Sequence, residues 1–199
     1  MAKRETAAAA TRQAPAAAAA IVDFLNSRPH ASPAFPDALA GGPEAARVLQ
    51  PFSPGGEPTP SDDDLRRLRE LRADLMAVAA PADPLTEREA WERVSRHAAR
   101  APFRYRFLFP GGGGAEVRAE PADGDQVTSN IIRSVAELIS SGDWSRIKAC
   151  ANPACAHVFY DATRSRTQRW DSYEVCGNRA NVAAYRSRRA QDPPAGSGE

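Results

Sequence analysis

The C-terminal part of the chain contains Cys150-Ala-Asn-Pro-Ala-Cys155, followed after fifteen residues by Asp171-Ser-Tyr-Glu-Val-Cys176. It holds all three cysteines of the 199-residue chain. Four residues separate the members of each pair, and a short loop of this kind can turn two ligands toward one ion. The spacing therefore predicts a zinc site with Cys150, Cys155, Asp171 and Cys176 as ligands.

The fourth ligand is open at this point. Asp171-Ser-Tyr-Glu174 also fits a capping box at the start of a last helix. His157 is a rival ligand, although it stands two residues after Cys155, where an outgoing strand would carry its side chain away from the ion. Water in the fourth position, or no metal at all, completes the alternatives.

The residues around these pairs resemble the CGNR zinc-finger family, named for a run that stands here as Cys176-Gly177-Asn178-Arg179. The resemblance runs through CANPACAHVFYDATRSRTQRWDSYEVCGNRANVAAYRSRR, residues 150–189. Other positions of the family pattern are in register: Phe159, Asp161, Arg164, Arg169 and Trp170. The chain departs from the pattern at Asp171, which stands where the family has its third cysteine.

A metal that ties the two pairs together would hold residues 156–170 as a short hairpin and clamp the start of a helix over about 176–190. Such a small module has too little apolar area to fold alone. We therefore expect metal binding to provide its stability, and metal removal to unfold residues 144–190 and leave the rest intact.

Charge separates this finger from the rest of the chain. Residues 144–189 hold 9 basic and 3 acidic residues, whereas residues 1–143 hold 17 and 20. A basic module behind an acidic body is typical of a protein of which one part meets a polyanion. The predicted contacts to duplex DNA are Arg164, Arg166, Arg169, Arg179, Arg186, Arg188 and Arg189.

The residues before the finger predict an α+β body. Ser61 followed by three acids predicts a helix start with Leu68, Leu71 and Leu75 on one face. Further helices are expected after a capping box at Thr86 and over 125–141, and the alternation over 103–119 indicates a β-hairpin around the turn PGGGG. We expect helices to surround this small antiparallel sheet, and residues 29–60, rich in proline and glycine, to form a long loop.

Three segments of the body, IVDFLNSR at 21–28, the helix that ends near Ala80, and NIIRSVAELISSGDWSRIKAC at 130–150, resemble the ABATE domain that precedes this finger. The resemblance implies a stress-induced transcription regulator. If the finger binds DNA, we expect the separate body to be a sensor, dimerisation or partner-binding domain, with a small-molecule or protein effector. The expected organisation is a disordered tail at 1–19, the body at 20–143, the finger at 144–190 and a second tail at 191–199.

Other classes of function are less well supported. Mean hydropathy is −0.50 and no stretch approaches the ~20 apolar residues that span a bilayer, so we expect a cytoplasmic protein without a membrane partner. The scarcity of lysine beside abundant arginine and alanine indicates a G+C-rich bacterial genome. His30 and His97 stand alone, and no base with a supporting partner is visible, so we expect no enzyme. The main alternative is a zinc-organised protein-interaction module without DNA binding.

Overall fold

The first helix, α1 (Ala16–Asn26), forms because alanine favours helix and one face is fully apolar. The computed structural model describes residues 13–31, 35–53, 55–56, 60–109, 116–122 and 125–191. Ala18, Ile21, Phe24 and Leu25 of α1 are completely buried. The predicted tail at 1–19 therefore extends too far, because 16–19 are helical; residues 1–12 lie outside the described part.

Residues 29–60 contain more structure than the predicted long loop. The short 3-10 helix η1 (Ala38–Ala40), the helix α2 (Gly42–Leu49) and the 3-10 helix η2 (Gln50–Phe52) follow one another there. They bury Leu39, Val48, Leu49 and Phe52 in the core. The prediction of a long loop was wrong because the glycines and prolines lie between these short elements or at their first residues. Glycine allows a turn at such positions, and proline is compatible with the first turn of a helix.

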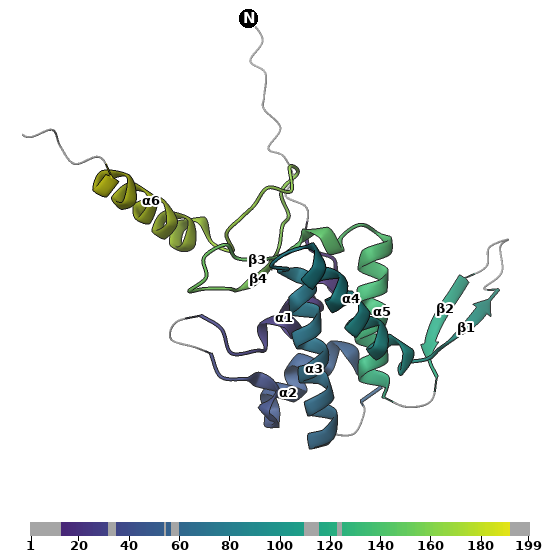
Figure 1. Cartoon of the computed structure of the whole chain (residues 1–199). Helices are drawn as coiled ribbons and strands as arrows, with labels where there is room; N and C mark the ends of the chain where they lie inside the picture. The colour runs from purple at the N-terminus through teal and green to yellow at the C-terminus, as the bar shows by residue number, and fades with distance from the viewer. Residues whose placement is uncertain are drawn as a thin grey trace, which may run out of the picture.

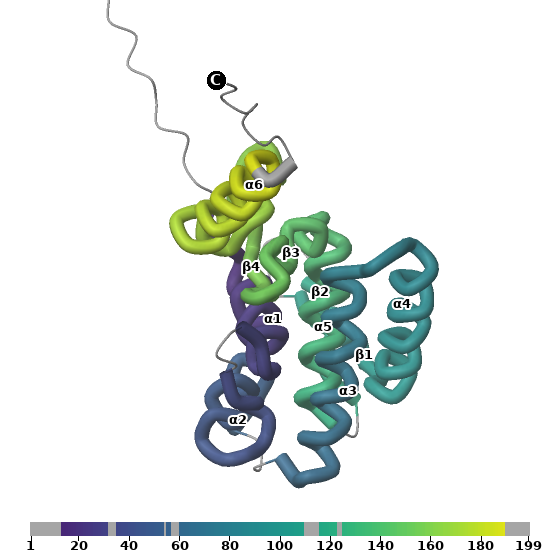
Figure 2. Tube along the Cα trace, turned by 60° about the vertical axis from the view of Figure 1, so that its left-hand side comes forward, coloured from purple at the N-terminus to yellow at the C-terminus, as the bar shows by residue number. Residues whose placement is uncertain are grey.

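The two helices α3 (Asp62–Ala79) and α4 (Pro84–Ala99) pack side by side (Figure 2). Ser61 and Asp64 form the capping box of α3, as the acidic start predicts. The box of α4 lies three residues earlier than predicted, because Asp83 is the N-cap and Thr86 is its partner. His97 of α4 contacts Asp74 of α3 at 3.0 Å, so this lone histidine joins two helices.

The helix α5 (Gln126–Ser140) completes the core between α1 and α4. Asp125 caps its start, and Gly142 follows its end with a φ of +74°. Arg72 of α3 is buried and ties the helices together, because it donates two hydrogen bonds to Asp37 at 2.8 and 2.7 Å. A bidentate pair of this kind satisfies a charge that burial would otherwise disfavour.

The strands β1 (Phe103–Leu108) and β2 (Glu116–Pro121) form the predicted antiparallel hairpin, but helices do not surround it. It projects from the helical body (Figure 1). Tyr105, Phe107 and Phe109 are 70%, 63% and 78% exposed. The expected enclosed sheet is thus wrong: the aromatic residues alternate along a strand but face solvent. The turn glycines 111–114 lie outside the described residues.

The second sheet belongs to the C-terminal part and consists of β3 (Ile147–Ala149) and β4 (Val158–Tyr160), after a 3-10 turn, η3 (Trp144–Arg146). This hairpin flanks the first cysteine pair, whereas the predicted hairpin over 156–170 does not form: 161–170 contain no described strand. Ile147 and Val158 join the core of the body. The hydrophobic core is therefore continuous across the expected boundary at residue 143.

The chain ends in a single π-helical turn, η4 (Tyr173–Gly177), that leads into α6 (Asn178–Gln191). The helix α6 extends away from the body (Figures 1 and 2), and the side chains at 181–189 are all exposed. Among the described residues, no helix is both long and apolar enough to cross a membrane.

Candidate metal centre

The hairpin of β3 and β4 places the first two thiols. Cys150 directly follows β3, and its backbone N–H donates to the carbonyl of His157 at 2.7 Å, which continues the strand pairing by one residue. The intervening residues then turn sharply, with the N–H groups of Cys155 and Ala156 both donating to the carbonyl of Asn152 at 2.9 Å. Ala156 has a φ of +52°, a conformation that reverses the chain toward β4. The tight turn brings Cys155 back beside Cys150.

Asp171 and Cys176 come from the start of the last turn and helix. Ser172, and not Asp171, is the N-cap there: its hydroxyl accepts from the N–H of Val175 at 3.3 Å. The capping alternative for Asp171 is therefore wrong by one residue. The N–H of Ala151 donates to the carbonyl of Arg169 at 2.9 Å, which holds the returning chain against the first cysteine loop. The carboxylate of Asp171 is thus directed at the thiols.

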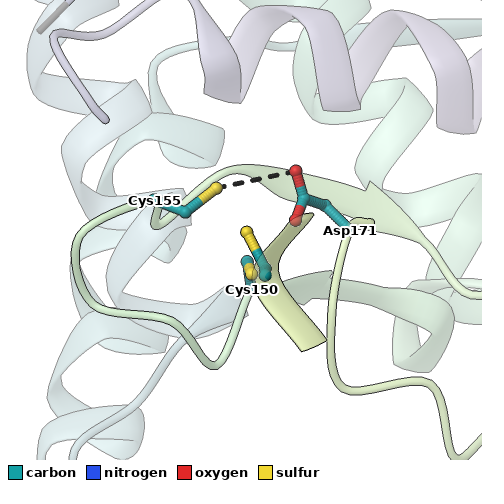
Figure 3. A group of neighbouring side chains, drawn as sticks. Cys150, Cys155 and Asp171 are labelled. Carbon is teal, nitrogen blue, oxygen red and sulfur yellow. Dashed lines mark hydrogen bonds between the residues drawn. The ribbon is translucent and has the colours of Figure 1, made fainter. Parts of the chain in front are cut away.

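The four predicted ligands meet at one place. One ligand atom from each of Cys150, Cys155, Asp171 and Cys176 lies within 4.8 Å of the others. Figure 3 shows Cys155 and Asp171 directed toward one another, with Cys155 Sγ and Asp171 Oδ2 at 3.5 Å. Cys150 and Cys176 are buried, and the other two are half-buried. Two pairs of residues that are at least 16 positions apart in sequence thereby form one group of soft and hard donors.

The electrostatics of the group fit a bound cation. Burial raises the pKa of Cys150 to about 12, and burial followed by the neighbouring Cys176 raises the pKa of Cys155. Asp171 behaves differently: burial opposes its ionisation, yet hydrogen bonds from the thiols of Cys150 and Cys176 lower its pKa. Its other oxygen, Oδ1, is buried without a hydrogen-bond partner in the described residues. A divalent ion would give this oxygen a partner and favour the thiolate forms.

His157, the rival ligand, points into the body. Its Nε2 lies 3.2 Å from the side-chain nitrogen of Asn26, and its Nδ1 lies 3.1 Å from Nε2 of His30. Because an amide NH₂ can only donate, Nε2 of His157 accepts, and the proton on Nδ1 is donated to His30. Both ring nitrogens are therefore hydrogen-bonded to the body. The structure brings Asp171, and not His157, together with the three thiols.

Asp161 organises the segment between the ligand pairs, a role that the residue pattern alone did not indicate. It is fully buried and accepts hydrogen bonds from Nζ of Lys148 at 2.7 Å, the hydroxyl of Thr163 at 2.5 Å and the backbone N–H of Gln168 at 3.0 Å. Burial alone would raise its pKa, but these donors lower the pKa to about 2. In the sequence, only the match of Asp161 to a position of the CGNR family pattern indicated that this residue has a role.

The seven predicted arginine contacts are all exposed and occupy two segments. Arg164, Arg166 and Arg169 lie on the loop organised by Asp161, where Arg169 stacks on the ring of Trp170 at 5.3 Å. The other four lie on α6. Within the described residues, none of the seven is in an ion pair with a carboxylate, whereas the buried Arg146 and the partly buried Lys148 are. The loop and the helix thus present to solvent guanidinium groups that have no carboxylate partner in the described residues.

Comparison with known families assigns both parts. Residues 18–142 match the ABATE family model, described as "Putative stress-induced transcription regulator". The chain belongs to the ABATE family. Residues 146–189 of this ABATE protein match the CGNR zinc-finger model, in the order that the resemblance implied. No curated protein is similar in sequence to the chain. The ABATE body thus precedes a finger with three cysteines and one aspartate at its centre.

Proposed function

We propose that this ABATE-family protein is a cytoplasmic transcription regulator whose finger holds one zinc ion and binds duplex DNA. The observation that carries the DNA-binding role is the set of exposed arginines on the loop 161–170 and on α6 that have no carboxylate partner in the described residues. Phosphates attract such groups regardless of sequence, and arginine can also form two hydrogen bonds with a guanine edge. The ABATE body would then bind the effector, a small molecule or a protein.

The zinc ion is proposed from the donor set. Three sulfur atoms and one carboxylate oxygen suit zinc, which takes four ligands and accepts both atom types. Cys150 and Cys155 would hold it from the β3–β4 side, and Asp171 and Cys176 from the side of α6. When bound, the ion supplies a cross-link between these two segments. The orientation of α6 relative to the body then depends on this link, because α6 has few other contacts.

One face of α6 is suited to a DNA groove. Asn178, Arg179, Val182 and Arg186 line a common shallow surface along the helix, together with Glu174 at its start. Arg189 follows Arg186 by three residues and extends this face, whereas Arg188 is turned by about 100° from Arg189. Arginine and asparagine are the side chains that read guanine and adenine edges, and a small apolar side chain can contact a thymine methyl group. A helix that projects freely can enter a major groove.

The experiment is a salt series of duplex binding with the full-length, zinc-loaded protein, followed by fluorescence anisotropy on a random-sequence duplex. With about four phosphate contacts, log affinity should fall with log salt at a slope of about −3 to −4. The double variant Arg186→Gln/Arg189→Gln should flatten the slope by about two units. The control variant Arg88→Gln/Arg96→Gln on α4 removes the same charge from the body and should leave the slope unchanged.

A slope near zero for the wild type would contradict DNA binding and favour the protein-interaction role. A specific observation supports that second candidate: Tyr173, Val175, Val182 and Tyr185 are large side chains exposed on and before α6. Exposed apolar groups on a basic helix also suit an acidic, partly apolar protein partner. Both candidates are binding roles, and we propose no catalytic one.

A further inference from the structure

We infer that Arg28, a residue of the body, compensates the negative charge of the metal centre in the finger. The inference rests on the proposed zinc site. Three thiolates and one carboxylate carry four negative charges, so a divalent ion leaves two of them uncompensated. Excess charge at a partly buried site is unfavourable unless cations or hydrogen-bond donors face it. The question is then which residues supply these donors.

Arg28 follows α1 and reaches across to the first cysteine loop. Its Nη2 donates to the carbonyl of Ala156, the residue after Cys155, at 2.5 Å. Three residues later, the N–H of Ala31 donates to the carbonyl of Cys155 at 3.1 Å. The body segment 28–31 therefore lies directly along the loop that carries two of the ligands, and it holds the guanidinium group at Ala156, the neighbour of Cys155.

A second nitrogen of the same guanidinium group remains available as a hydrogen-bond donor. Its Nη1 is buried and has no hydrogen-bond partner in the described part of the chain. Burial and then the nearby Arg72 lower the pKa of Arg28, and Cys155 acts in the opposite direction. A thiolate at Cys155 would be the acceptor that a buried, unpaired N–H group requires.

Two cations of the finger that precede Cys150 are already engaged by other acceptors. Lys148 pairs with Asp161. Arg146 donates to the carbonyls of Asp161 and Thr163, each at 2.9 Å. Asn152 provides a neutral donor to Cys176 Sγ at 3.5 Å. Arg169 and Arg179 of the finger are exposed to solvent, whereas Arg28 adds a charged donor from the body beside the first cysteine loop. Zinc affinity in the finger then depends on how the body contacts this loop.

The test measures zinc affinity of the full-length protein by competition with a chromogenic chelator. Outer-shell partners of metal ligands contribute about 10–100-fold to affinity, so Arg28→Gln should weaken zinc binding by that factor. Arg28→Lys keeps the charge and should lose less. The matched control is Arg47→Gln, which removes an exposed arginine from α2 and should leave the affinity unchanged.

A second comparison separates charge compensation from a structural role of Arg28. In an Asp171→Asn background the centre has one negative charge fewer, so the loss caused by Arg28→Gln should shrink. A merely structural role predicts the same fold loss in both backgrounds, which would overturn the inference. Equal zinc affinity of wild type and Arg28→Gln would also overturn it. Absence of zinc binding by the wild type would refute the proposed site itself. Should Arg28→Gln fail to fold, Arg28→Lys carries the comparison.

Discussion

The side-chain amide of Asn26 hydrogen-bonds both backbone polar groups of Val158, donating to its carbonyl and accepting from its N–H, each at 2.8 Å. A residue of α1 thereby pairs with β4 as a neighbouring strand would. Val158 itself is fully buried in the core. The finger is therefore not structurally separate from the body. Its hairpin of β3 and β4 is hydrogen-bonded to α1 and packs into the same hydrophobic core.

Replacement of Asn26 by alanine should lower the free energy of unfolding by about 2–3 kcal/mol. The variant leaves two buried backbone groups of Val158 without partners, and each such group is destabilising by about 1–3 kcal/mol. Urea denaturation monitored by tryptophan fluorescence measures the change. The control Asn181→Ala removes an amide from the exposed face of α6 and should change stability by less than about 0.5 kcal/mol. A similar effect of both variants would contradict the role of Asn26.

Substitutions at Asp171 should change zinc affinity in opposite directions. Asp171→Cys should bind zinc more tightly than the wild type, because zinc prefers sulfur to oxygen donors, and Asp171→Ala should bind it more weakly. His157→Ala should reduce the affinity less than Asp171→Ala does, since both ring nitrogens of His157 face the body. Titration of each variant against a competing chelator gives the order. A larger loss for His157→Ala would reverse the assignment of the fourth ligand.

Removal of the metal should loosen the chain only after residue 160. The helix α6 packs mainly against η4, whereas β3 and β4 are held by the core and by Asn26. After treatment with a chelator, trypsin should cleave first after Arg164, Arg166 or Arg169, and the helices α1 to α5 should remain. Mass spectrometry of the fragments identifies the sites, and excess zinc should protect them. Cleavage throughout the body at the same rate would show that metal supports the whole fold.

The buried carboxylate of Asp161 should make stability depend on pH in the acid range. Its pKa of about 2 in the folded protein is below the ordinary value near 3.8, so ionised Asp161 stabilises the fold above about pH 4. This contribution is lost as the pH falls toward 2. The stability difference between the wild type and Asp161→Asn should thus shrink by about 1 kcal/mol between pH 6 and pH 3. Urea unfolding at each pH measures it, and parallel pH profiles would contradict the expectation.

Local patterns in the chain sufficed for several features. The start of α3 at Ser61, the span of α5 after Asp125 and the hairpin of β1 and β2 follow from capping residues and periodicity within short windows. The spacing within the pairs Cys150–Cys155 and Asp171–Cys176 likewise predicted which four side chains lie together. These signals are readable because a cap, a helix face or a strand alternation involves residues only a few positions apart.

Other features depended on contacts that no local window contains. Whether the aromatic residues of β1 would be covered was settled by how the helices pack, and they are exposed. Ser172 and not Asp171 caps the last turn, a shift of one residue that frees a carboxylate for the thiols. His157 turns to His30 and Arg28 reaches Ala156 across about 130 residues of sequence. Such pairings arise only when the core brings α1 and β4 together. The local sequence permits several partners for each of these side chains, and packing in the folded core decides which partner is within reach.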